Sequence, residues 1–443
     1  MATPCAIWSR SLHSLPNPDA GGETIRILVC NNRYFVSGGP ERYMFSVMDL
    51  LRGRGHAVVP FSMRYSKNLD TPYARYFTAP PAGEDLVYLE DRPLNLREKL
   101  GMFGRILYNP AVVRDVQRVI AQERIDLVYT LQVAHYLYPG VVLGAVKAGV
   151  PVVSRLSDFS LIAPCYTLFR DEPCTKCVAG GRWRAVLYGC VRDSRAVSLA
   201  RVAAMAFHGL LGAREKIDAF VTPSRFTGEL LAQDGVHEAR IHHVPTFVDP
   251  PTDPEGVSRG RAFLYAGNLF AHKGVATLIK AVSMVPEAEL LIAGDAGIAQ
   301  GPGLVRLARD LGIEGNRVRF VGHLDKGRLG ALYAGSLATV VPSEWFENMP
   351  NAALESMSHG TPVIAGRIGS LPEIVEDRIN GLLFSPGDAD SLAEVLRWSL
   401  TNPEELAAFG QRARLAAAER HSPQKHYEEL IAVFESVLSA PPS

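Results

Sequence analysis

The sequence predicts an α/β protein with two doubly wound parallel sheets. Short apolar runs alternate with amphipathic segments along most of the 443 residues, and repeated strand–helix units of this kind build parallel sheets. The alternation stops at residues 241–261, which are rich in Pro and Asp and lack helical periodicity. A chain of this length is expected to form two or three domains. We therefore place the interdomain linker in this stretch, with one sheet on each side.

The first half begins with an apolar strand at residues 25–30, followed by a Gly-Gly turn and an amphipathic helix over about 41–52. Further strands are expected at residues 125–130 and 217–224, with a helix near 139–148 between them. We expect residues 24–246 to form an N-terminal domain. Residues 1–23 are expected to form a flexible leader.

The second half repeats the pattern. Apolar strands are expected in the segments AFLYAG, AELLIAG, RVRFVG, LATVV and TPVIAG, each followed by a loop or helix. We expect residues 247–418 to form a second Rossmann-like domain, with a final helix over about 423–438.

Composition excludes several classes of protein. Lys plus Arg and Asp plus Glu both number 46, and this neutral balance argues against nucleic acid as the main partner. No run of about 18 uncharged apolar residues occurs, so no membrane-spanning helix is expected. The N-terminus lacks the basic and apolar regions of a signal peptide. A cytoplasmic protein without disulfides is the expectation.

The most informative segment runs from residue 338 to residue 384. An apolar strand leads into a loop and then a helix, with Pro350 in the first turn and Gly360 at the end. Two acids, Glu347 in the loop and Glu355 in the helix, have seven residues between them. Both therefore belong to one strand–loop–helix–strand unit of a parallel sheet.

This segment resembles the E-x7-E signature of the GT-B glycosyltransferases of family 4. The positions that follow the order of the family are Pro342, Ser343, Glu347, Pro350, Glu355, Gly360, Pro362, Val363, Gly369, Glu373 and Asn380–Phe384. The resemblance implies the GT-B fold, in which two Rossmann-like domains face each other across a cleft. It also implies that the final helix, within residues 419–443, returns to the N-terminal domain.

The implied activity is retaining transfer of a sugar from a nucleotide diphosphate sugar to an acceptor hydroxyl, without a catalytic metal or other cofactor. The acceptor would be a saccharide or a lipid-linked molecule, in polysaccharide or glycolipid assembly.

The two acids are candidates for binding the donor. A carboxylate near the start of a helix can accept hydrogen bonds from two adjacent ribose hydroxyls, and the resemblance gives this role to Glu355. It gives Glu347, a candidate catalytic residue, a contact with the donor sugar. The alternative is that Glu347 is an ordinary acid of a loop and Glu355 a solvated residue of a helix. Gly38 and Gly39 open a helix after the first strand, so their N–H groups could face a diphosphate, although a tight turn is an alternative.

A candidate phosphate clamp lies after the first strand of the second half. The resemblance implies that Lys273 contacts the donor phosphates and acts in catalysis, whereas a surface lysine is the alternative. Asn268 stands where the family has an arginine. An amide cannot neutralise a dianionic leaving group, so Lys273 would act with another cation, Arg225 or Arg367.

Other positions match the family less strongly. Gly322 resembles part of the loop that reads the nucleotide base through its backbone. Glu373 matches the region beside the sugar phosphate, or it caps the short helix that follows. Asp158, a candidate catalytic residue, matches the Asp of a His-Asp pair, with Ser157 in place of the His. His135 could contact the acceptor, but a structural role is the more common one for a lone histidine.

Four cysteines form a separate signal in an insert at about residues 160–192, which resembles the cysteine-bearing inserts of a bacterial subgroup of the family. They are Cys165, Cys174, Cys177 and Cys190. A CxxC pair with two further cysteines suits a tetrahedral thiolate site, most simply structural zinc. A disulfide, unliganded thiols and an iron–sulfur cluster are alternatives.

A long apolar segment with Arg192, Arg195 and Arg201 follows the insert. We favour a core helix with charged ends. The alternative is an interfacial helix at an anionic membrane, where a lipid-linked acceptor would lie.

Two other functions stay open. One is another GT-B enzyme, such as a nucleotide-sugar epimerase, although the extra acid–base groups this chemistry needs are not evident. The other is a non-catalytic scaffold protein, favoured by the substitutions at Asn268 and Ser157. The presence of Glu347, Glu355 and Lys273 argues against it.

Overall fold

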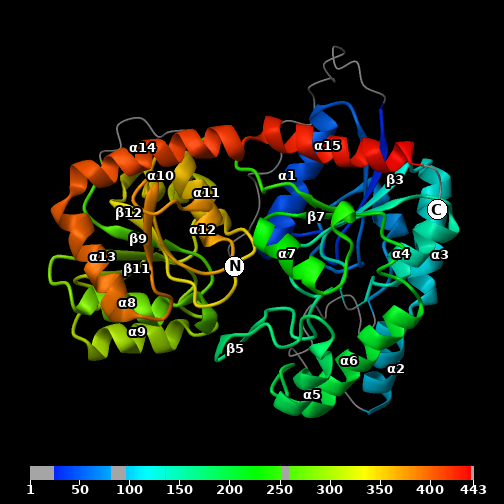
Figure 1. The fold of residues 1–443 in the computed structure, drawn as a ribbon, viewed down its shortest axis with the longest axis horizontal. Coiled ribbons are helices and arrows are strands. Elements are labelled where there is room, and N and C mark those ends of the chain that lie inside the picture. Colours follow the sequence, from blue (N-terminus) through cyan, green and yellow to red (C-terminus); the bar gives the residue numbers. More distant parts are fainter. Residues whose placement is uncertain (1–23, 81–95, 135, 252–258, 441–443) are drawn as a thin grey trace.

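The computed structural model describes residues 24–80, 96–134, 136–251 and 259–440. The expected leader and His135 lie outside these residues. The chain forms two lobes, each a six-stranded parallel sheet between layers of helices (Figure 1). The predicted α/β fold with two doubly wound parallel sheets is confirmed.

The first sheet has the strand order β2-β1-β3-β4-β7-β8, so the order reverses between β1 and β3. Its strands are β1 (Arg26–Cys30), β2 (Ala57–Phe61), β3 (Leu127–Thr130), β4 (Val152–Arg155), β7 (Ala219–Thr222) and β8 (Ile241–His243). Its helices are α1 (Gly39–Gly53), α2 (Leu96–Leu107), α3 (Pro110–Glu123), α4 (Gly140–Lys147), α5 (Arg184–Tyr188), α6 (Arg195–Leu210) and α7 (Arg225–Gln233).

The second sheet has the order β11-β10-β9-β12-β13-β14 and reverses between β9 and β12. Its strands are β9 (Phe263–Ala266), β10 (Leu290–Ala293), β11 (Val318–Phe320), β12 (Ala338–Val341), β13 (Val363–Gly366) and β14 (Gly381–Phe384). The helices that follow β9 in sequence are α8 (Val275–Ser283), α9 (Gly301–Asp310), α10 (Lys326–Gly335), α11 (Asn351–Ser358), α12 (Leu371–Ile374), α13 (Ala389–Thr401), α14 (Pro403–Arg420) and α15 (Pro423–Ser439).

Both faces of the first sheet are buried, as expected for parallel strands. Successive residues of β1 point to opposite faces, so Leu28 packs with α3 and α4 whereas Ile27 packs with α1. The face that carries Ile27 is completed by Leu430 and Phe434 of α15. The last helix therefore supplies part of the core of the first domain.

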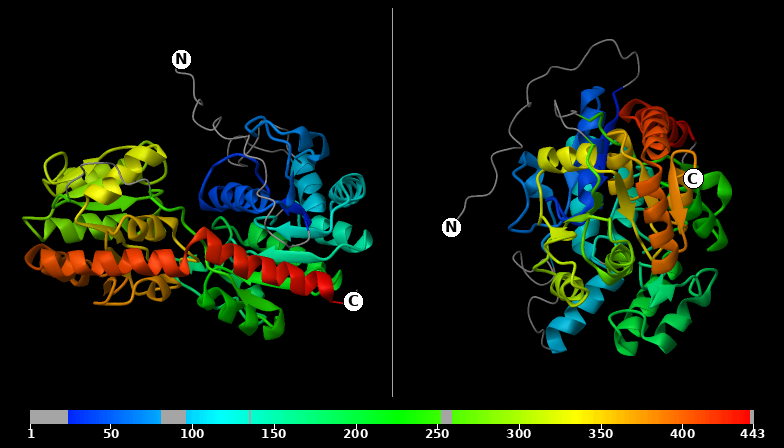
Figure 2. Two further views of the ribbon diagram at one scale, coloured as in Figure 1. Left: turned by 90° about the horizontal axis from the view of Figure 1, so that it is seen from above. Right: turned by 90° about the vertical axis from the view of Figure 1, so that its left-hand side faces the viewer.

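Helices α14 and α15 run in succession along the molecule, first beside the second domain and then across the first (Figure 2). His421 lies at their junction, and its backbone carbonyl accepts a hydrogen bond of 2.9 Å from the Val248 N–H. His426 of α15 makes a 3.0 Å hydrogen bond with the Tyr43 hydroxyl and a 2.6 Å hydrogen bond with the Pro245 carbonyl. Burial lowers the pKa of His426 to about 3, so its ring is neutral at neutral pH.

The linker begins later than the sequence indicated. Residues 241–243 form the edge strand β8, which pairs in parallel with β7. This strand, Ile-His-His, is short and polar, and it therefore carries no strand signal of its own.

The cysteine insert contains a two-stranded antiparallel hairpin, β5 (Phe169–Arg170) and β6 (Glu172–Pro173). Among the described residues, no helix is long and apolar enough to cross a bilayer.

Candidate functional site

The point at which the second sheet reverses its strand order brings two predicted residues together. Lys273 ends the short 3-10 turn η5 (Ala271–Lys273) after β9, and Glu347 lies in the loop after the neighbouring strand β12. Lys273 Nζ donates a 2.7 Å hydrogen bond to Glu347 Oε1. The carboxyl ends of strands at such a reversal are the usual ligand site of open α/β sheets.

Two glycines allow these loops to pack closely. Gly274 has a φ of +69°, and a Cβ there would lie 1.8 Å from the Pro342 carbonyl oxygen. Gly369 has a φ of +58°, and a Cβ there would lie 2.8 Å from the backbone of Glu347. A side chain at either position would displace the loop that carries Glu347 or the turn that carries Lys273.

The environment keeps Glu347 charged although only 5% of the residue is exposed. Burial alone would raise its pKa, but the Lys273 ammonium and hydrogen bonds from Lys273 and Ser343 outweigh burial and hold the pKa below its usual range. The neighbouring His272 is affected in the opposite direction. Burial and the Lys273 charge lower its pKa to about 4, so His272 is neutral at neutral pH.

Glu355 lies in α11, at the interface between the two domains. Its Oε2 accepts a 3.0 Å hydrogen bond from the Tyr333 hydroxyl, and its Oε1 lies 3.8 Å from Nη1 of Arg42 in α1. Burial raises the pKa of Glu355, and the Arg42 charge and the Tyr333 hydroxyl offset part of this effect. Its side chain is 30% exposed, so Glu355 is not a fully solvated helix residue.

The glycine turn of the first domain faces the same helix. Gly38 is the N-cap of α1 and Gly39 its first residue. A Cβ on Gly39 would lie 3.5 Å from Nδ2 of Asn351, the first residue of α11. The N-termini of α1 and α11 therefore approach each other across the domain interface. Because the first N–H groups of a helix have no intrahelical partner and lie at the positive end of its dipole, this arrangement suits a diphosphate.

Glu373 joins the two domains. Its Oε2 accepts a hydrogen bond from the Arg225 N–H and its Oε1 one from the Phe226 N–H, both 2.8 Å long. These are the first two N–H groups of α7. Glu373 thus caps a helix of the other domain, and not its own short helix.

The remaining donor-side candidates, Asn268 and Gly322, also follow strands of the second sheet. The Asn268 side chain is exposed at the end of β9, and Gly322, with a φ of +75°, follows β11. Of the two cations expected to assist Lys273, Arg367 pairs with Asp377 at 2.9 Å. Arg225 is exposed at the start of α7.

Asp158 follows β4 at the carboxyl edge of the first sheet. Its Oδ2 accepts a 3.1 Å hydrogen bond from Gln132 Nε2, and its Oδ1 accepts a 2.9 Å hydrogen bond from the Ser160 N–H. These bonds fix the orientation of the Asp158 carboxylate at this edge of the first sheet.

The four cysteines of the insert are free thiols. Burial raises the pKa of the Cys177 thiol to about 12, and the neighbouring Cys165, Cys190 and Cys174 raise it too. Within the part of the chain that the structure describes, however, no three His, Cys, Asp or Glu side chains are placed to hold a metal ion. The expected zinc site is therefore not supported.

Sequence reasoning missed three residues near the site. Arg42 and Tyr333 both contact Glu355. Glu41, in the first turn of α1, is 1% exposed, and its Oε1 has no hydrogen-bond partner among the described residues. The position of Glu41 and Arg42 directly after the Gly38–Pro40 turn was a signal that could have identified them.

Comparison with known proteins places this geometry in a family. Residues 38–247 match the model described as "Glycosyl transferase 4-like domain", and residues 255–416 match "Glycosyl transferases group 1". The MMP alpha-(1->4)-mannosyltransferase of Mycolicibacterium hassiacum is 31% identical over 237 residues, 51% of this chain and 56% of that protein. A D-inositol 3-phosphate glycosyltransferase of Mycolicibacterium paratuberculosis is 31% identical over 177 residues, 39% of this chain and 40% of that protein. The chain thus spans about half the length of these curated relatives.

Solved structures show the same fold over nearly the whole chain. Sucrose-phosphate synthase from Thermosynechococcus elongatus is 21% identical with a TM-score of 0.66, over 94% of this chain and 100% of that one. Anabaena Alr3699/HepE, solved in complex with UDP-glucose, is 18% identical with a TM-score of 0.64, over 93% of this chain and 100% of that one. The two family models together with this fold show that the chain belongs to the GT-B glycosyltransferases of family 4.

Proposed function

We propose that the protein transfers a glycosyl group from a nucleotide diphosphate sugar to an acceptor hydroxyl, with the donor bound at the interface between the two domains. The observation that carries this proposal is the Lys273–Glu347 pair at the strand reversal of the second sheet. The facing N-termini of α1 and α11 support it, as does the UDP-glucose held by Anabaena Alr3699/HepE.

The proposed reaction retains the anomeric configuration. The acceptor oxygen bonds to the anomeric carbon on the face from which the nucleotide leaves, and the acceptor proton passes to the leaving phosphate oxygen. Lys273 and the helix N-termini stabilise the charge that develops on this phosphate. Glu347 orients the donor sugar, and Asp158 faces the acceptor.

Glu355 is proposed to bind the ribose hydroxyls. Its carboxylate now faces Arg42 of the other domain at 3.8 Å, so donor binding would exchange a long ion pair for two hydrogen bonds. Such an exchange links nucleotide binding to the position of the first domain, because Arg42 belongs to α1. Closure of the domains around the donor would also exclude water.

Calorimetric titration with UDP, GDP, ADP and their common sugar conjugates tests the site. We expect one nucleotide series to bind and Glu355→Ala to lose that binding. Glu287→Ala, at an exposed position of the second domain, is the matched control and should bind as the unchanged protein does. Binding that survives in Glu355→Ala would refute the assignment. If the unchanged protein binds none of these nucleotides or sugar conjugates, the result would favour the non-catalytic alternative.

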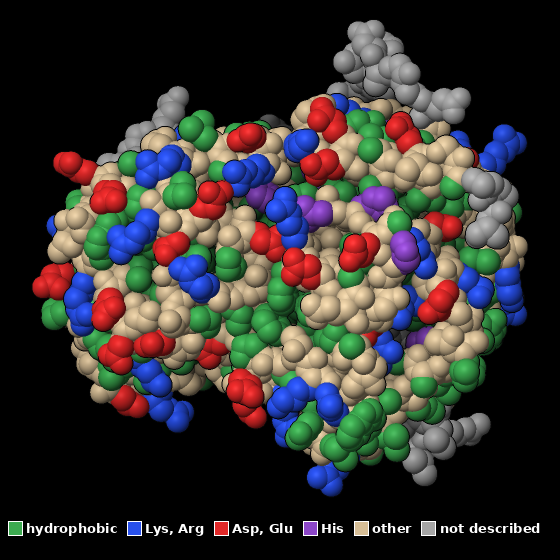
Figure 3. Space-filling view, viewed as in Figure 1, with side chains coloured by type: hydrophobic (Ala, Val, Ile, Leu, Met, Phe, Trp, Pro, Cys, Tyr) green, Lys and Arg blue, Asp and Glu red, His purple; other side chains and the backbone are tan. Residues whose placement is uncertain are grey.

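We also propose that the acceptor is lipid-linked and is reached at an anionic membrane surface. Exposed apolar side chains gather on α5 and α6 (Figure 3). This α5–α6 patch comprises Trp183, which directly precedes α5, and Leu187, Tyr188, Val197, Leu199, Phe207 and Leu210, of which Leu210 is 85% exposed. Exposed cations at Lys176, Arg184 and Arg195 flank it. Apolar side chains beside cations suit the boundary of an anionic bilayer.

Sedimentation with vesicles tests the membrane contact. We expect the protein to bind vesicles of phosphatidylglycerol and phosphatidylcholine, and to bind less to phosphatidylcholine alone. Leu199→Gln with Leu210→Gln should weaken this binding. Ile298→Gln with Leu415→Gln removes two apolar side chains of the second domain that are 57% and 70% exposed, and this pair should not weaken vesicle binding. Equal loss in both pairs would contradict the proposal.

A further inference from the structure

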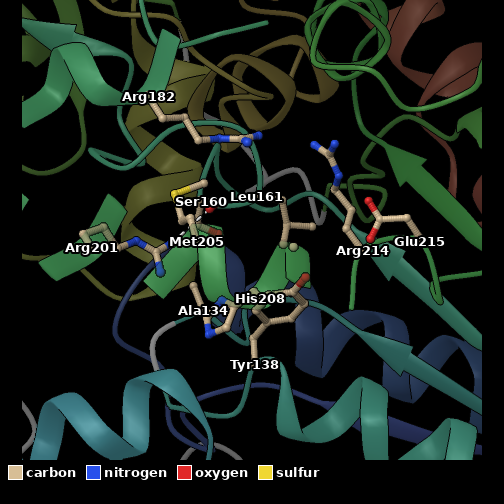
Figure 4. Close-up of a pocket in the computed structure, with 11 residues that line it drawn as sticks. Ala134, Tyr138, Ser160, Leu161, Arg182, Arg201, Met205, His208, Arg214 and Glu215 are labelled. Carbon is tan, nitrogen blue, oxygen red and sulfur yellow. Dashed lines mark hydrogen bonds between the residues drawn. The ribbon is translucent and has the colours of Figure 1, made fainter. Parts of the chain in front are cut away.

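A small cavity of about 70 Å³ lies in the first domain beside the loop that carries Asp158 (Figure 4). Its walls come from α6, from the residues after β4, from the cysteine insert and from the turn before β7. Three arginines, Arg182, Arg201 and Arg214, approach it from different sides. None of these has a role in the proposed transfer reaction.

Arg201 is the unusual member of this group. It is 8% exposed, and its only hydrogen bond to a described residue runs from Nη2 to the Ser160 carbonyl at 3.0 Å. Its Nε has no partner among the described residues, and no described carboxylate forms an ion pair with it. An arginine stays charged in proteins, and burial of a charge without a counter-ion is costly. The site therefore contains a buried guanidinium group with an Nε–H that has no partner among the described residues.

Among the described residues, no neighbouring carboxylate contacts the Arg201 guanidinium directly. Arg182 and Arg214 both donate to the buried carboxylate of Asp234, so one anion already serves two cations. Glu215 lines the cavity from an exposed position. Asp158 accepts hydrogen bonds from Gln132 and from the Ser160 N–H, and its charge favours the charged form of Arg201, but among the described residues the two side chains form no ion pair. The Nε–H of Arg201 therefore remains available to an anionic ligand in the cavity.

We propose that this cavity binds an oxyanion, a phosphate or carboxylate group, through the free N–H groups of Arg201, and that the acceptor carries this group. Guanidinium groups bind both kinds of oxyanion with paired hydrogen bonds. The link to the acceptor rests on the function proposed above. It follows from the shared wall, since Ser160 contacts both the Asp158 carboxylate and Arg201. An acceptor hydroxyl near Asp158 and an anion at Arg201 would then belong to one molecule.

Titration calorimetry with inorganic phosphate and with acetate, at constant ionic strength, tests the cavity. We expect the unchanged protein to bind at least one of them and Arg201→Gln to bind it at least about tenfold more weakly. The probe that binds more tightly distinguishes a phosphate-bearing from a carboxylate-bearing ligand. Failure of both probes to bind, or equal affinity in Arg201→Gln, would overturn the proposal.

Two other cationic regions could bind the same probes and need controls. A larger cavity of about 520 Å³ is lined by five arginines, among them Arg105 and Arg114, and Lys273 lies in the donor site. Arg105→Gln with Arg114→Gln, and separately Lys273→Gln, should retain the tight phosphate or acetate binding. Loss in either of these variants, with retention in Arg201→Gln, would assign the anion elsewhere.

A second variant tests the proposal independently, in case Arg201→Gln does not fold. Met205 lies beside Arg201 in the cavity wall (Figure 4), so Met205→Glu would offer a built-in carboxylate. We expect this variant to raise the melting temperature and to abolish anion binding. A lower melting temperature with unchanged phosphate binding would refute the reasoning.

The two proposals fail independently. Arg201→Gln should leave nucleotide binding unchanged, and Glu355→Ala should leave phosphate or acetate binding unchanged. Anion binding at Arg201 without any nucleotide binding would preserve the cavity and remove its link to an acceptor. Nucleotide binding without anion binding would refute the proposed oxyanion site and leave the proposed transfer reaction intact.

Discussion

Replacement of Lys273 by Met gives the sharpest test of how the central ion pair is held. The change keeps much of the apolar stem and removes the ammonium that donates to Glu347 at 2.7 Å. With Lys273 absent, burial becomes the dominant influence on Glu347. Its folded-state pKa, now below the usual range, should then rise above it.

The size of the effect follows from the geometry. At 2.7 Å, with an effective dielectric constant of about 20, the attraction is roughly 6 kcal/mol. The desolvation of both groups offsets part of this, and the Lys273 side chain is still 23% exposed. Loss of one partner from a largely buried pair costs about 3 kcal/mol on balance. We expect Lys273→Met to lower the free energy of unfolding by about this amount at neutral pH.

The directions of the two pKa shifts determine how the difference in unfolding free energy changes with pH. In the unchanged protein the folded-state pKa of Glu347 is lowered, so its contribution is present above the unfolded-state pKa and is lost as pH falls. In Lys273→Met that pKa is raised, so protonation favours the folded state as pH falls. The difference between the two proteins should therefore shrink from about pH 8 to about pH 5.

Urea unfolding at several pH values measures this difference. Lys273→Met with Glu347→Gln is the matched control, since it removes both charges and should show a constant difference from the unchanged protein. A difference for Lys273→Met that stays equal at all pH values would show that Glu347 is not held charged by Lys273.

Two further changes test the packing of the site and the anchor of α15. Gly274→Ala should lower the free energy of unfolding by more than about 2 kcal/mol, because the methyl group meets the Pro342 carbonyl at a positive φ. Gly303→Ala, where nothing lies within 4 Å, should be neutral or stabilising in urea unfolding. His426 is neutral when folded, with a pKa near 3 against about 6.5 when unfolded. Acidification from about pH 6.5 to about pH 4.5 should therefore cost roughly 2 kcal/mol at this residue. His426→Gln should lose less stability over that range, and an identical acid profile would contradict the burial argument.

The spacing of two acids allowed much of the site to be predicted. Glu347 and Glu355 were placed on one strand–loop–helix unit, and the structure has that unit at β12 and α11. The partners of Glu355 could not be predicted in the same way. Arg42 belongs to the other domain and Tyr333 to a different helix, and their proximity depends on how the domains and helices pack.

Helix α6 shows where hydrophobic periodicity misleads. The side chains it buries include Ser198, Arg201 and His208, whereas Leu199 and Leu210 are exposed. The buried polar groups find backbone partners, since Ser198 Oγ accepts from the Val191 N–H and His208 Nε2 lies 2.9 Å from the Ile106 carbonyl. The favoured interpretation, a core helix with charged ends, describes only one face of this helix. Such backbone partners depend on the tertiary fold, and no local pattern in the sequence reveals them.

The path of α15 has a consequence for how the chain is made. One face of the core of the first domain needs Leu430 and Phe434, which are translated only after the whole second domain. The second domain has its sheet and the helices of its core in one continuous stretch, 263–420, and can pack as soon as that stretch leaves the ribosome. The first domain, although synthesised earlier, must wait with an apolar face uncovered until the last helix arrives. Chains that terminate early in α15 would thus release a finished second domain tethered to an incomplete first one, a natural target for chaperones and proteases.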